Sequence, residues 1–174
     1  AGWERANWFA PKGVEPKYQY SYTRQNWFDF SAAEHRAVRE NVGLFDQTSF
    51  SKFLLQGRDA VRVLNRICGN QIDVPLGKVV YTQILNERGG IEADVTITRL
   101  GSDRFYIVDA AATQMKTFSY IQSHMIEDEH AFLTDVTSAY AVLSVMGPNS
   151  RTLLGGLTDA DLSNEAFPFA TSQD

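Results

Sequence analysis

The sequence VVYTQILNERGGIEADVTITR, residues 79–99, decides the fold, because it holds two strand-like runs joined by a glycine-containing turn. The first run, residues 79–85, is rich in β-branched residues. Gly89 and Gly90 can take the positive φ angles of a hairpin loop. Apolar and polar residues then alternate strictly, which is the period of a strand with one buried face. The stretch predicts a β-hairpin that buries Ile91, Ala93, Val95 and Ile97.

Asp94 falls in the middle of the second strand, on the face opposite these apolar residues. An aspartate within a strand is unfavourable on propensity, and it is costly where the site is covered. We therefore expect a partner or a ligand to compensate it. The strand pattern alone favours the simpler interpretation, an ordinary residue on a hydrated sheet face that pairs with a threonine or an arginine.

The composition is that of an ordinary globular chain of 174 residues, with 44% hydrophobic and 21% charged residues. This length is enough for one domain with a core or for two small subdomains. A net charge of −5 argues against nucleic acid, which requires a concentrated basic surface. The single cysteine, Cys68, has no partner for an internal disulfide and is most simply a small buried hydrophobic residue. No apolar run approaches the length of a membrane span, and the first residues lack a signal-peptide pattern.

The segments around the hairpin predict an α+β fold, an antiparallel sheet with packed helices. A third strand at residues 105–109 extends the hairpin into an antiparallel meander. A helix is expected to begin at Ser31, where Glu34 completes a capping box, and to end near Gly43. The other expected elements are a strand at 50–56, a helix after Asp59, a helix at 113–125 with Met115, Phe118, Ile121 and Met125 facing inward, strands at 132–136 and 140–146 joined by a short turn, and a helix at 149–154.

Residues 1–30 hold all three tryptophans but show no clear hydrophobic period. Such a segment is too aromatic for a disordered tail and too irregular for an element of its own. We expect an extended arm that lies across this domain or a neighbouring one. The domain itself is then expected to span residues 31–174.

The sequence lacks the common catalytic and cofactor motifs. It contains no GxGxxG dinucleotide fingerprint, no GxxxxGK[ST] phosphate loop, no HExxH and no cysteine pair. His35, His124 and His130 do not have the spacing of metal ligands, so no metal site is expected. Cys68 has no plausible base near it in the sequence.

The motif Gly89-Gly90-Ile91-x-x-Asp94, preceded by Tyr81 and by Asn86-Glu87, resembles the folate-binding domain of the glycine-cleavage T-protein, or aminomethyltransferase. The resemblance extends through VGLFDQTSF at 42–50, the helix from Asp59, and VLSVMGPNSRTLL at 142–154. The arm sequence GWERANWFAP, followed by RQNWF, is similar to the segment that links the FAD-binding half to the T-protein-like half in dimethylglycine and sarcosine dehydrogenases.

The resemblance implies a reaction of two stages. A flavin elsewhere in the full enzyme oxidises an N-methyl amine to an iminium, and tetrahydrofolate captures the iminium carbon to give 5,10-methylenetetrahydrofolate and the demethylated amine. A carboxylate suits the second stage, because it can stabilise the cation, hold the folate nitrogens and accept a proton. In this family the position of Asp94 lies beside the reactive folate nitrogens, so Asp94 is the expected catalytic residue.

The resemblance also implies a set of folate-binding residues. Tyr81 matches a position that lines the folate pocket, although a cross-strand aromatic residue would also suit a hairpin. Phe50 and Ile107 match positions where the family packs apolar side chains near the pterin or benzoyl ring, but they could equally be core residues. Thr96 follows from alternation rather than from the resemblance: it lies two residues beyond Asp94 on the same face of the strand, so we expect it to line the same site.

This sequence departs from the family pattern at two points. The T-protein commonly has two adjacent acids where this chain has Ala93-Asp94, so the first acid cannot be essential to the assignment. The resemblance implies that the acidic residue that holds the pterin edge in the T-protein, and a further β-rich half, would lie beyond residue 174. The 174 residues are therefore expected to carry part of a folate site and no amine oxidation by themselves.

Two alternatives remain: a stand-alone aminomethyltransferase or folate-dependent demethylase, and a non-catalytic regulatory scaffold with the same fold. The expected ligands are tetrahydrofolate here and FAD in a preceding domain, which would deliver the oxidised methylated amine. No nucleic-acid or membrane partner is expected. The expected compartment is the cytoplasm in a bacterium or the mitochondrial matrix in a eukaryote.

Overall fold

The computed structural model describes Glu4 and residues 6–174, and it divides the chain into two compact units. The first unit comprises Gln47–Val142 and Asp161–Asp174, and the second comprises the described residues up to Asp46 together with Leu143–Ala160. Apart from two short 3-10 turns, the elements are α1 (Phe28–Glu40), β1 (Gly43–Asp46), β2 (Ser51–Gln56), α2 (Ala60–Ile67), β3 (Val79–Leu85), β4 (Ile91–Arg99), β5 (Arg104–Asp109), α3 (Gln114–Ser123), β6 (Phe132–Asp135), β7 (Leu143–Met146) and α4 (Ser150–Gly155). The class is α+β with antiparallel sheets, as predicted.

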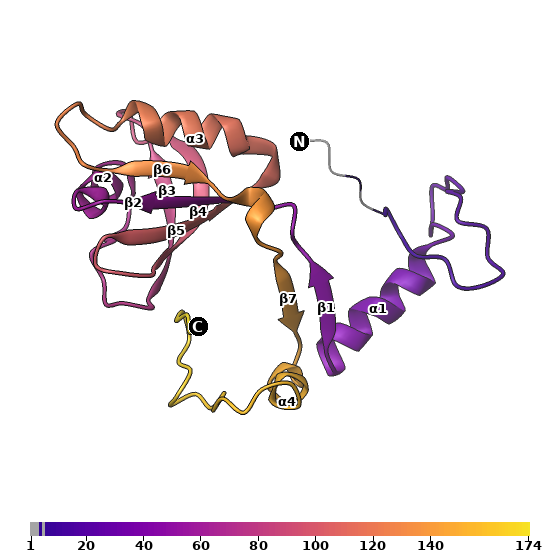
Figure 1. The fold of residues 1–174 in the computed structure, drawn as a ribbon. Coiled ribbons are helices and arrows are strands. Elements are labelled where there is room, and N and C mark those ends of the chain that lie inside the picture. Colours follow the sequence, from indigo (N-terminus) through magenta and orange to yellow (C-terminus); the bar gives the residue numbers. More distant parts are fainter. Residues whose placement is uncertain (1–3, 5) are drawn as a thin grey trace. The chain divides into compact units, whose positions relative to one another are not determined.

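The first unit is built on a five-stranded sheet with the strand order β3-β4-β5-β2-β6 (Figure 1). The predicted meander of β3, β4 and β5 is confirmed, since both of its strand pairs are antiparallel. β2 lies between β5 and β6 and pairs antiparallel with both. The sheet therefore brings the early strand β2 into register with strands that lie much later in the chain.

One face of this sheet carries the hydrophobic core. The alternate residues of β4, Ala93, Val95 and Ile97, are buried as the periodicity predicted. They pack with buried residues of β2, β3 and β5 and with the apolar sides of α2 and α3. Phe118 of α3 meets Phe53 of β2 edge to face, with ring centroids 5.6 Å apart. Both helices thus cover the same face, and the opposite face of the sheet carries no helix of this unit.

Two of the expected core residues are in fact exposed. Ile91 is 66% exposed because it stands at the first position of β4, beside the hairpin turn, where no helix covers it. Met115 is 69% exposed because it lies in the first turn of α3, whose buried residues come later. In the turn itself only Gly89 has a positive φ, +77°. The alternation pattern was correct within the strand and failed at its end.

The second unit contains a two-stranded sheet that the sequence did not reveal. β1 and β7 pair antiparallel, with Gly43 opposite Met146, and Figure 1 shows them side by side. The prediction that residues 132–136 and 140–146 form neighbouring strands was wrong, because β6 joins the five-stranded sheet and β7 joins β1. Gly147 has a φ of +130°, and a Cβ there would lie 2.3 Å from the Asn41 carbonyl oxygen. Only glycine allows this approach.

The predicted start of α1 was also wrong. The helix begins at Phe28, and the amide of Ser31 donates to the Trp27 carbonyl oxygen, so Ser31 lies inside the first turn. Its side chain therefore does not form the N-terminal cap that the Ser31–Glu34 spacing indicated. No residue of α1 is buried. The domain boundary predicted near residue 30 stays a prediction.

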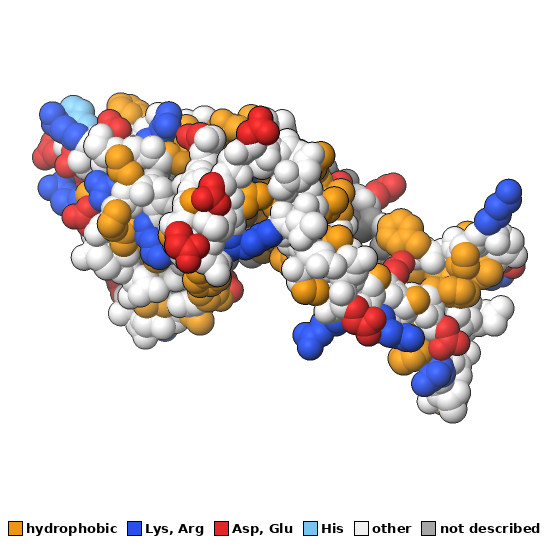
Figure 2. Space-filling model, turned by 90° about the horizontal axis from the view of Figure 1, so that it is seen from below, with side chains coloured by type: hydrophobic (Ala, Val, Ile, Leu, Met, Phe, Trp, Pro, Cys, Tyr) orange, Lys and Arg blue, Asp and Glu red, His pale blue; other side chains and the backbone are white. Residues whose placement is uncertain are grey.

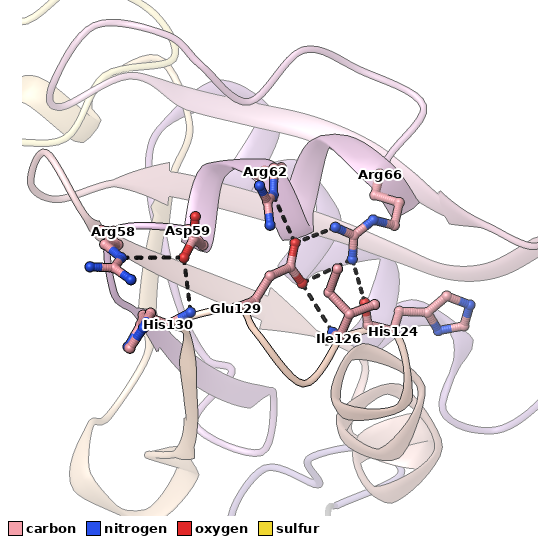
Figure 3. A network of polar contacts seen from close by, with 8 residues as sticks. All are labelled: Arg58, Asp59, Arg62, Arg66, His124, Ile126, Glu129 and His130. Atoms are coloured by element: carbon pink, nitrogen blue, oxygen red, sulfur yellow. Dashed lines mark hydrogen bonds and ion pairs between the residues drawn. The ribbon is translucent and has the colours of Figure 1, made fainter.

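A network of ion pairs attaches the loop after α3 to α2 (Figure 3). The Glu129 side chain has no exposed surface, and its carboxylate receives hydrogen bonds from Arg66, from Arg62 at 2.9 Å and from the Ile126 amide at 3.1 Å. The bond from Arg66 foremost holds the pKa of Glu129 down to about 2 against the opposing effect of burial. Asp59 directly precedes α2, but its side chain makes no capping bond to that helix and accepts a bond of 2.9 Å from the His130 amide. These bonds fix residues 124–130 to one helix.

The surface carries charges of both signs. On the face drawn in Figure 2, basic and acidic side chains are interspersed rather than gathered into one basic patch. Within the part of the chain that the structure describes, no helix is long and apolar enough to cross a membrane.

Candidate functional site

The candidate site lies on the face of the five-stranded sheet opposite the core. Cross-strand partners point to the same face of a sheet, and the registers place Tyr81 opposite Thr96 and Gln83 opposite Asp94. Thr96 is paired in turn with Val108 of β5, and Val108 with Lys52 of β2. Tyr81 and Asp94 are exposed, whereas Thr96 and Val108 are half-buried. The result is a partly apolar floor with a carboxylate at one end.

Both carboxylate oxygens of Asp94 are held by neighbours on β3. The Tyr81 hydroxyl donates to Oδ2 at 2.7 Å, and the Gln83 side-chain amide donates to Oδ1 at 3.3 Å. The partners are therefore a tyrosine and a glutamine, and not the threonine or arginine of the simpler interpretation. Each oxygen has further lone pairs, so the carboxylate can still accept bonds from a ligand above the sheet.

The hydrogen bond changes the acidity of its donor. Donation to the Asp94 carboxylate raises the pKa of the Tyr81 hydroxyl above its ordinary value of 10.0, and burial and the negative charge act in the same direction. Tyr81 therefore stays protonated and remains a donor at neutral pH. The pair is fixed on two rigid strands, which suits a group that must meet a ligand at a set position.

The structure brings together three of the five predicted site residues. Asp94, Tyr81 and Thr96 share the open face of the hairpin. Phe50 lies in the bend before β2 and is half-buried. Extending the printed registers by one pair between β2 and β5, and by two pairs between β5 and β4, brings it level with Asp94. Ile107 is fully buried and pairs with Ile97 and Phe53, so it belongs to the core on the opposite face. The structure does not place Ile107 beside the others.

The structure also adds residues that the sequence did not single out. Gln83 holds the second oxygen of Asp94, and alternation along β3 could have indicated it, because it lies two residues from Tyr81 on the same face. Tyr106 is half-buried on this face, next to Val108 in alternation, and meets the ring of Tyr140 edge to face at 5.8 Å. No local pattern could have joined Tyr140 to Tyr106, because 34 positions separate them in the printed sequence.

Metal and thiol chemistry find no support among the residues that the structure describes. None of the His, Cys, Asp and Glu side chains there form a group of three or more that could hold a metal ion. Cys68 packs against the core, and burial raises the pKa of its thiol to about 12. A thiol with that pKa is not a nucleophile near neutral pH.

The fold and the site define a class, an α+β domain with helices on one face of an antiparallel sheet and a held carboxylate on the other. The chain belongs to the GCVT N-terminal domain family, whose model matches residues 1–174.

Among curated relatives, the chain is 48% identical over 165 residues to the 4-methylaminobutanoate oxidase (formaldehyde-forming) of Paenarthrobacter nicotinovorans, covering 95% of this chain and 20% of that protein. It is 31% identical to the mitochondrial dimethylglycine dehydrogenase of Mus musculus, over 97% of this chain and 19% of that enzyme. It is 30% identical to the mitochondrial pyruvate dehydrogenase phosphatase regulatory subunit of Mus musculus, over 96% of this chain and 20% of that protein. The chain thus spans about a fifth of the length of these relatives.

A solved structure shows the same fold. The glycine cleavage system aminomethyltransferase T from Bartonella henselae matches with a TM-score of 0.68 and 24% identity, over 80% of this chain and 39% of that one. The prediction of a T-protein-like domain is therefore confirmed. The roles of the five predicted site residues stay predictions.

Proposed function

We propose that this chain is the tetrahydrofolate-binding part of a larger FAD-dependent N-methyl amine dehydrogenase. It would receive the one-carbon unit oxidised at the flavin, with 5,10-methylenetetrahydrofolate and the demethylated amine as the products. The observation that carries the proposal is the Asp94 carboxylate, held at both oxygens by Tyr81 and Gln83 on an open sheet face. Membership of the GCVT N-terminal domain family supports it.

The residues of this face suit a folate. Tyr81 and Tyr106 offer aromatic surface to a flat heterocycle, and Val108 and Thr96 form a half-buried floor between them. A ligand that covers the face would shield Asp94 from water, which strengthens its interaction with a positive charge. These features fit a reduced pterin whose ring nitrogens lie near the carboxylate.

The role of Asp94 follows from its fixed geometry. When bound, the folate supplies the nitrogens that accept the one-carbon unit. Asp94 would stabilise the cationic carbon as it arrives, hold a folate N–H by a charge-assisted hydrogen bond, and accept the proton released as the ring closes. Tyr81 and Gln83 would keep the carboxylate in one orientation, so that little reorganisation accompanies the step.

The flavin and the choice of amine belong to the rest of the larger protein in this proposal. The chain contains no GxGxxG fingerprint, so FAD would be bound by a preceding domain, linked through residues 1–30. The relatives include an oxidase of 4-methylaminobutanoate and a dehydrogenase of dimethylglycine, which supports an N-methylated amino acid as the substrate class. Sarcosine remains within that class.

A second candidate is a non-catalytic regulatory scaffold. The similarity to a phosphatase regulatory subunit, at 30% identity, favours this alternative. The held carboxylate favours the folate function over it, because a scaffold has no need of an oriented acid on an open face. A stand-alone aminomethyltransferase is disfavoured by the arm sequence that precedes the domain.

Calorimetric titration of tetrahydrofolate tests the proposal. It would be done on this chain and on a longer protein that also contains the remainder of the T-protein-like half, each with and without Asp94→Asn. We expect the longer protein to bind and Asp94→Asn to weaken binding by about 10- to 100-fold, the range for losing a hydrogen bond to a charged group.

The matched control is Asp103→Asn, which removes an acid from an exposed turn outside the site and should leave the affinity unchanged. Absence of binding by the longer protein would reject the folate function and favour the regulatory scaffold. Equal binding by the wild type and Asp94→Asn would keep folate but remove Asp94 from the site.

A further inference from the structure

Lys52 is a fully buried lysine in β2, at 0% exposure. It stands opposite Val108, in the same cross-strand row as Thr96 and Tyr81, and so on the same face as Asp94. Neighbouring strands lie about 4.8 Å apart, which puts Lys52 roughly 10 Å from Thr96 across the sheet. Lysine is almost never fully buried unless its ammonium is paired. The burial of Lys52 is explained by the groups that its ammonium binds.

The ammonium of Lys52 binds two backbone carbonyls from distant parts of the chain. Nζ donates to the Thr48 carbonyl oxygen at 2.8 Å and to the Tyr140 carbonyl oxygen at 2.7 Å. Thr48 precedes β2, whereas Tyr140 follows β6 and the 3-10 turn at Thr137–Ala139. One side chain therefore fastens two segments that lie 92 positions apart in the printed sequence.

Further hydrogen bonds join the two segments, residues 47–50 and 140–142, which we together call the clasp. The Gln47 amide donates to the Val142 carbonyl oxygen at 2.8 Å, and the Val142 amide donates to the Thr48 hydroxyl at 3.2 Å. These are the segments through which the chain enters and leaves the first unit, at Asp46–Gln47 and at Val142–Leu143. The clasp thus joins the segment by which the chain enters this unit to the segment by which it leaves, beside the start of β2.

The clasp carries two aromatic residues of the candidate site. Phe50 lies in the bend between Thr48 and β2, and its amide donates to the Gln47 carbonyl oxygen at 3.0 Å. Tyr140 supplies a carbonyl to Lys52 and packs its ring edge to face on Tyr106. Moving either carbonyl away from Lys52 would therefore move an aromatic ring at the rim of the open face.

We propose that Lys52 is a positioning residue of the ligand site, which sets the places of Phe50 and Tyr140 by clamping the segments that carry them. The inference rests on the proposed folate function and deepens it. A buried charge is costly to desolvate, and an apolar side chain of similar volume would often stabilise the fold as well or better. A lysine suits this position because it fixes two backbone carbonyls in one arrangement, which an apolar side chain cannot do.

The test compares Lys52→Met with the wild type in the longer protein described above. Methionine keeps the length and apolar stem of the side chain but cannot bind the carbonyls. We expect faster amide hydrogen exchange at Gln47 and Val142, with exchange at the centre of β4 unchanged under native conditions. We also expect tetrahydrofolate to bind about tenfold or more weakly, because small misplacements of site residues cost affinity steeply.

Three further variants separate positioning from general stability. Thr48→Val removes the hydroxyl that binds the Val142 amide; it should shift exchange and affinity in the same direction, and its effect should not add to that of Lys52→Met. Val63→Ala weakens the core from α2 and should leave the affinity of the folded protein within about twofold of wild type. Lys116→Met removes a surface ion pair with Glu92 and should likewise leave the affinity within about twofold of wild type.

Each outcome decides the inference. If Lys52→Met lowers thermal stability only, with exchange at Gln47 and Val142 and the folate affinity as in Val63→Ala, Lys52 is merely structural and the inference is rejected. If Lys52→Met does not fold, Thr48→Val carries the same comparison. If the wild type itself fails to bind tetrahydrofolate, the proposed function and the role of Lys52 in positioning a folate both fail. Faster amide exchange confined to Gln47 and Val142 in Lys52→Met would still show that Lys52 holds the clasp together.

Discussion

At the scale of single residues, the protein holds one carboxylate in a defined orientation on an open sheet face. Tyr81 and Gln83 each bind one oxygen of Asp94, and both come from the strand paired with it. Two donors to one carboxylate restrict its rotation, because turning the group breaks both bonds. The arrangement favours an acid that acts on a ligand, although the same bonds also stabilise the hairpin.

Tyr81→Phe should weaken tetrahydrofolate binding about 2- to 10-fold, since it removes one neutral hydrogen-bond donor from the carboxylate. Tyr81 is 59% exposed, so the thermal midpoint should change little. Calorimetric titration of the longer protein measures the affinity, and Tyr22→Phe, at a fully exposed tyrosine, is the control. An affinity equal to wild type would show that Tyr81 has no part in the site.

The acidity of Tyr81 gives a test that needs no ligand. The Asp94 hydrogen bond raises the pKa of its hydroxyl, so the proton is retained at a higher pH than in an ordinary tyrosine. Asp94→Asn should therefore move the phenolate titration of Tyr81 toward lower pH. Ultraviolet titration, with Tyr81→Phe subtracted to isolate its signal, measures the shift. An unchanged titration would mean that the bond does not form in solution.

At the scale of elements, stability depends on how loops are attached to helices and strands. The loop of residues 124–130 is fastened to α2 by Glu129, whose carboxylate accepts bonds from two arginines of that helix (Figure 3). Gly57 adjoins the same loop, since a Cβ there would lie 2.1 Å from the His130 carbonyl oxygen. The Glu129 bonds join α2, and the close approach of Gly57 joins the turn before α2, to residues that follow α3. Neither feature shows in a local pattern.

Glu129→Gln should lower the free energy of unfolding at pH 7 by about 1 to 3 kcal/mol, because it leaves two arginines without their charged partner. The pKa of Glu129 is held at about 2, below its ordinary value of 4.5. Its contribution is therefore complete above pH 4.5 and is lost as the pH falls toward 2. Urea unfolding at pH 7 and at pH 3 measures this, with Glu87→Gln as an exposed control. The prediction is wrong if the difference in the free energy of unfolding between the wild type and Glu129→Gln is the same at pH 7 and at pH 3.

Gly57→Ala should destabilise the protein by several kcal/mol, roughly 2 to 4, because it adds a steric clash to a strained backbone conformation. Gly89→Ala is the matched control: its φ is also positive, +77°, but no atom lies within 4 Å of the added Cβ. That variant should lose only about 1 kcal/mol. Chemical denaturation of both variants gives the difference, and equal losses would mean that the close approach to His130 is relaxed in solution.

At the scale of the whole molecule, the core belongs to one of the two units. Every buried hydrophobic residue in the described part of the chain lies between Phe53 and Ile121, within the first unit. The second unit holds α1, which has no buried residue, and a two-stranded sheet with exposed Leu44 and Leu143. Stability in such a chain is expected to be uneven, because few buried contacts oppose local opening in the second unit.

Ile97→Ala should cost the first unit about 2 to 5 kcal/mol, since it removes a fully packed side chain from the centre of the core. Amide exchange in β3, β4 and β5 should become faster, whereas exchange in α1 and β1 should stay as in wild type. Leu44→Ala, at a side chain 64% exposed, is the control for the second unit. Parallel loss of protection in both units would show that the chain unfolds as one cooperative body.

The central hairpin, its buried face and the position of Asp94 could all be predicted from the amino-acid sequence alone. The sequence also indicated the family, because the motif around Gly89, Gly90 and Asp94 resembles the T-protein. These properties are local: alternation reports which face of a strand is buried, and a short motif records the turn beside it. The same locality explains the errors at Ile91, Met115 and Ser31, where an element's end is decided by what covers it.

The folded structure was needed to show which distant segments meet. It paired β7 with β1 instead of β6, placed Ile107 on the opposite face from Asp94, and brought Thr48 and Tyr140 to the ammonium of Lys52. It also supplied Gln83 as the second partner of Asp94. Long-range strand pairing depends on the packing of the whole core, and the partner of a buried charge depends on that pairing, so neither can be read from spacing along the chain.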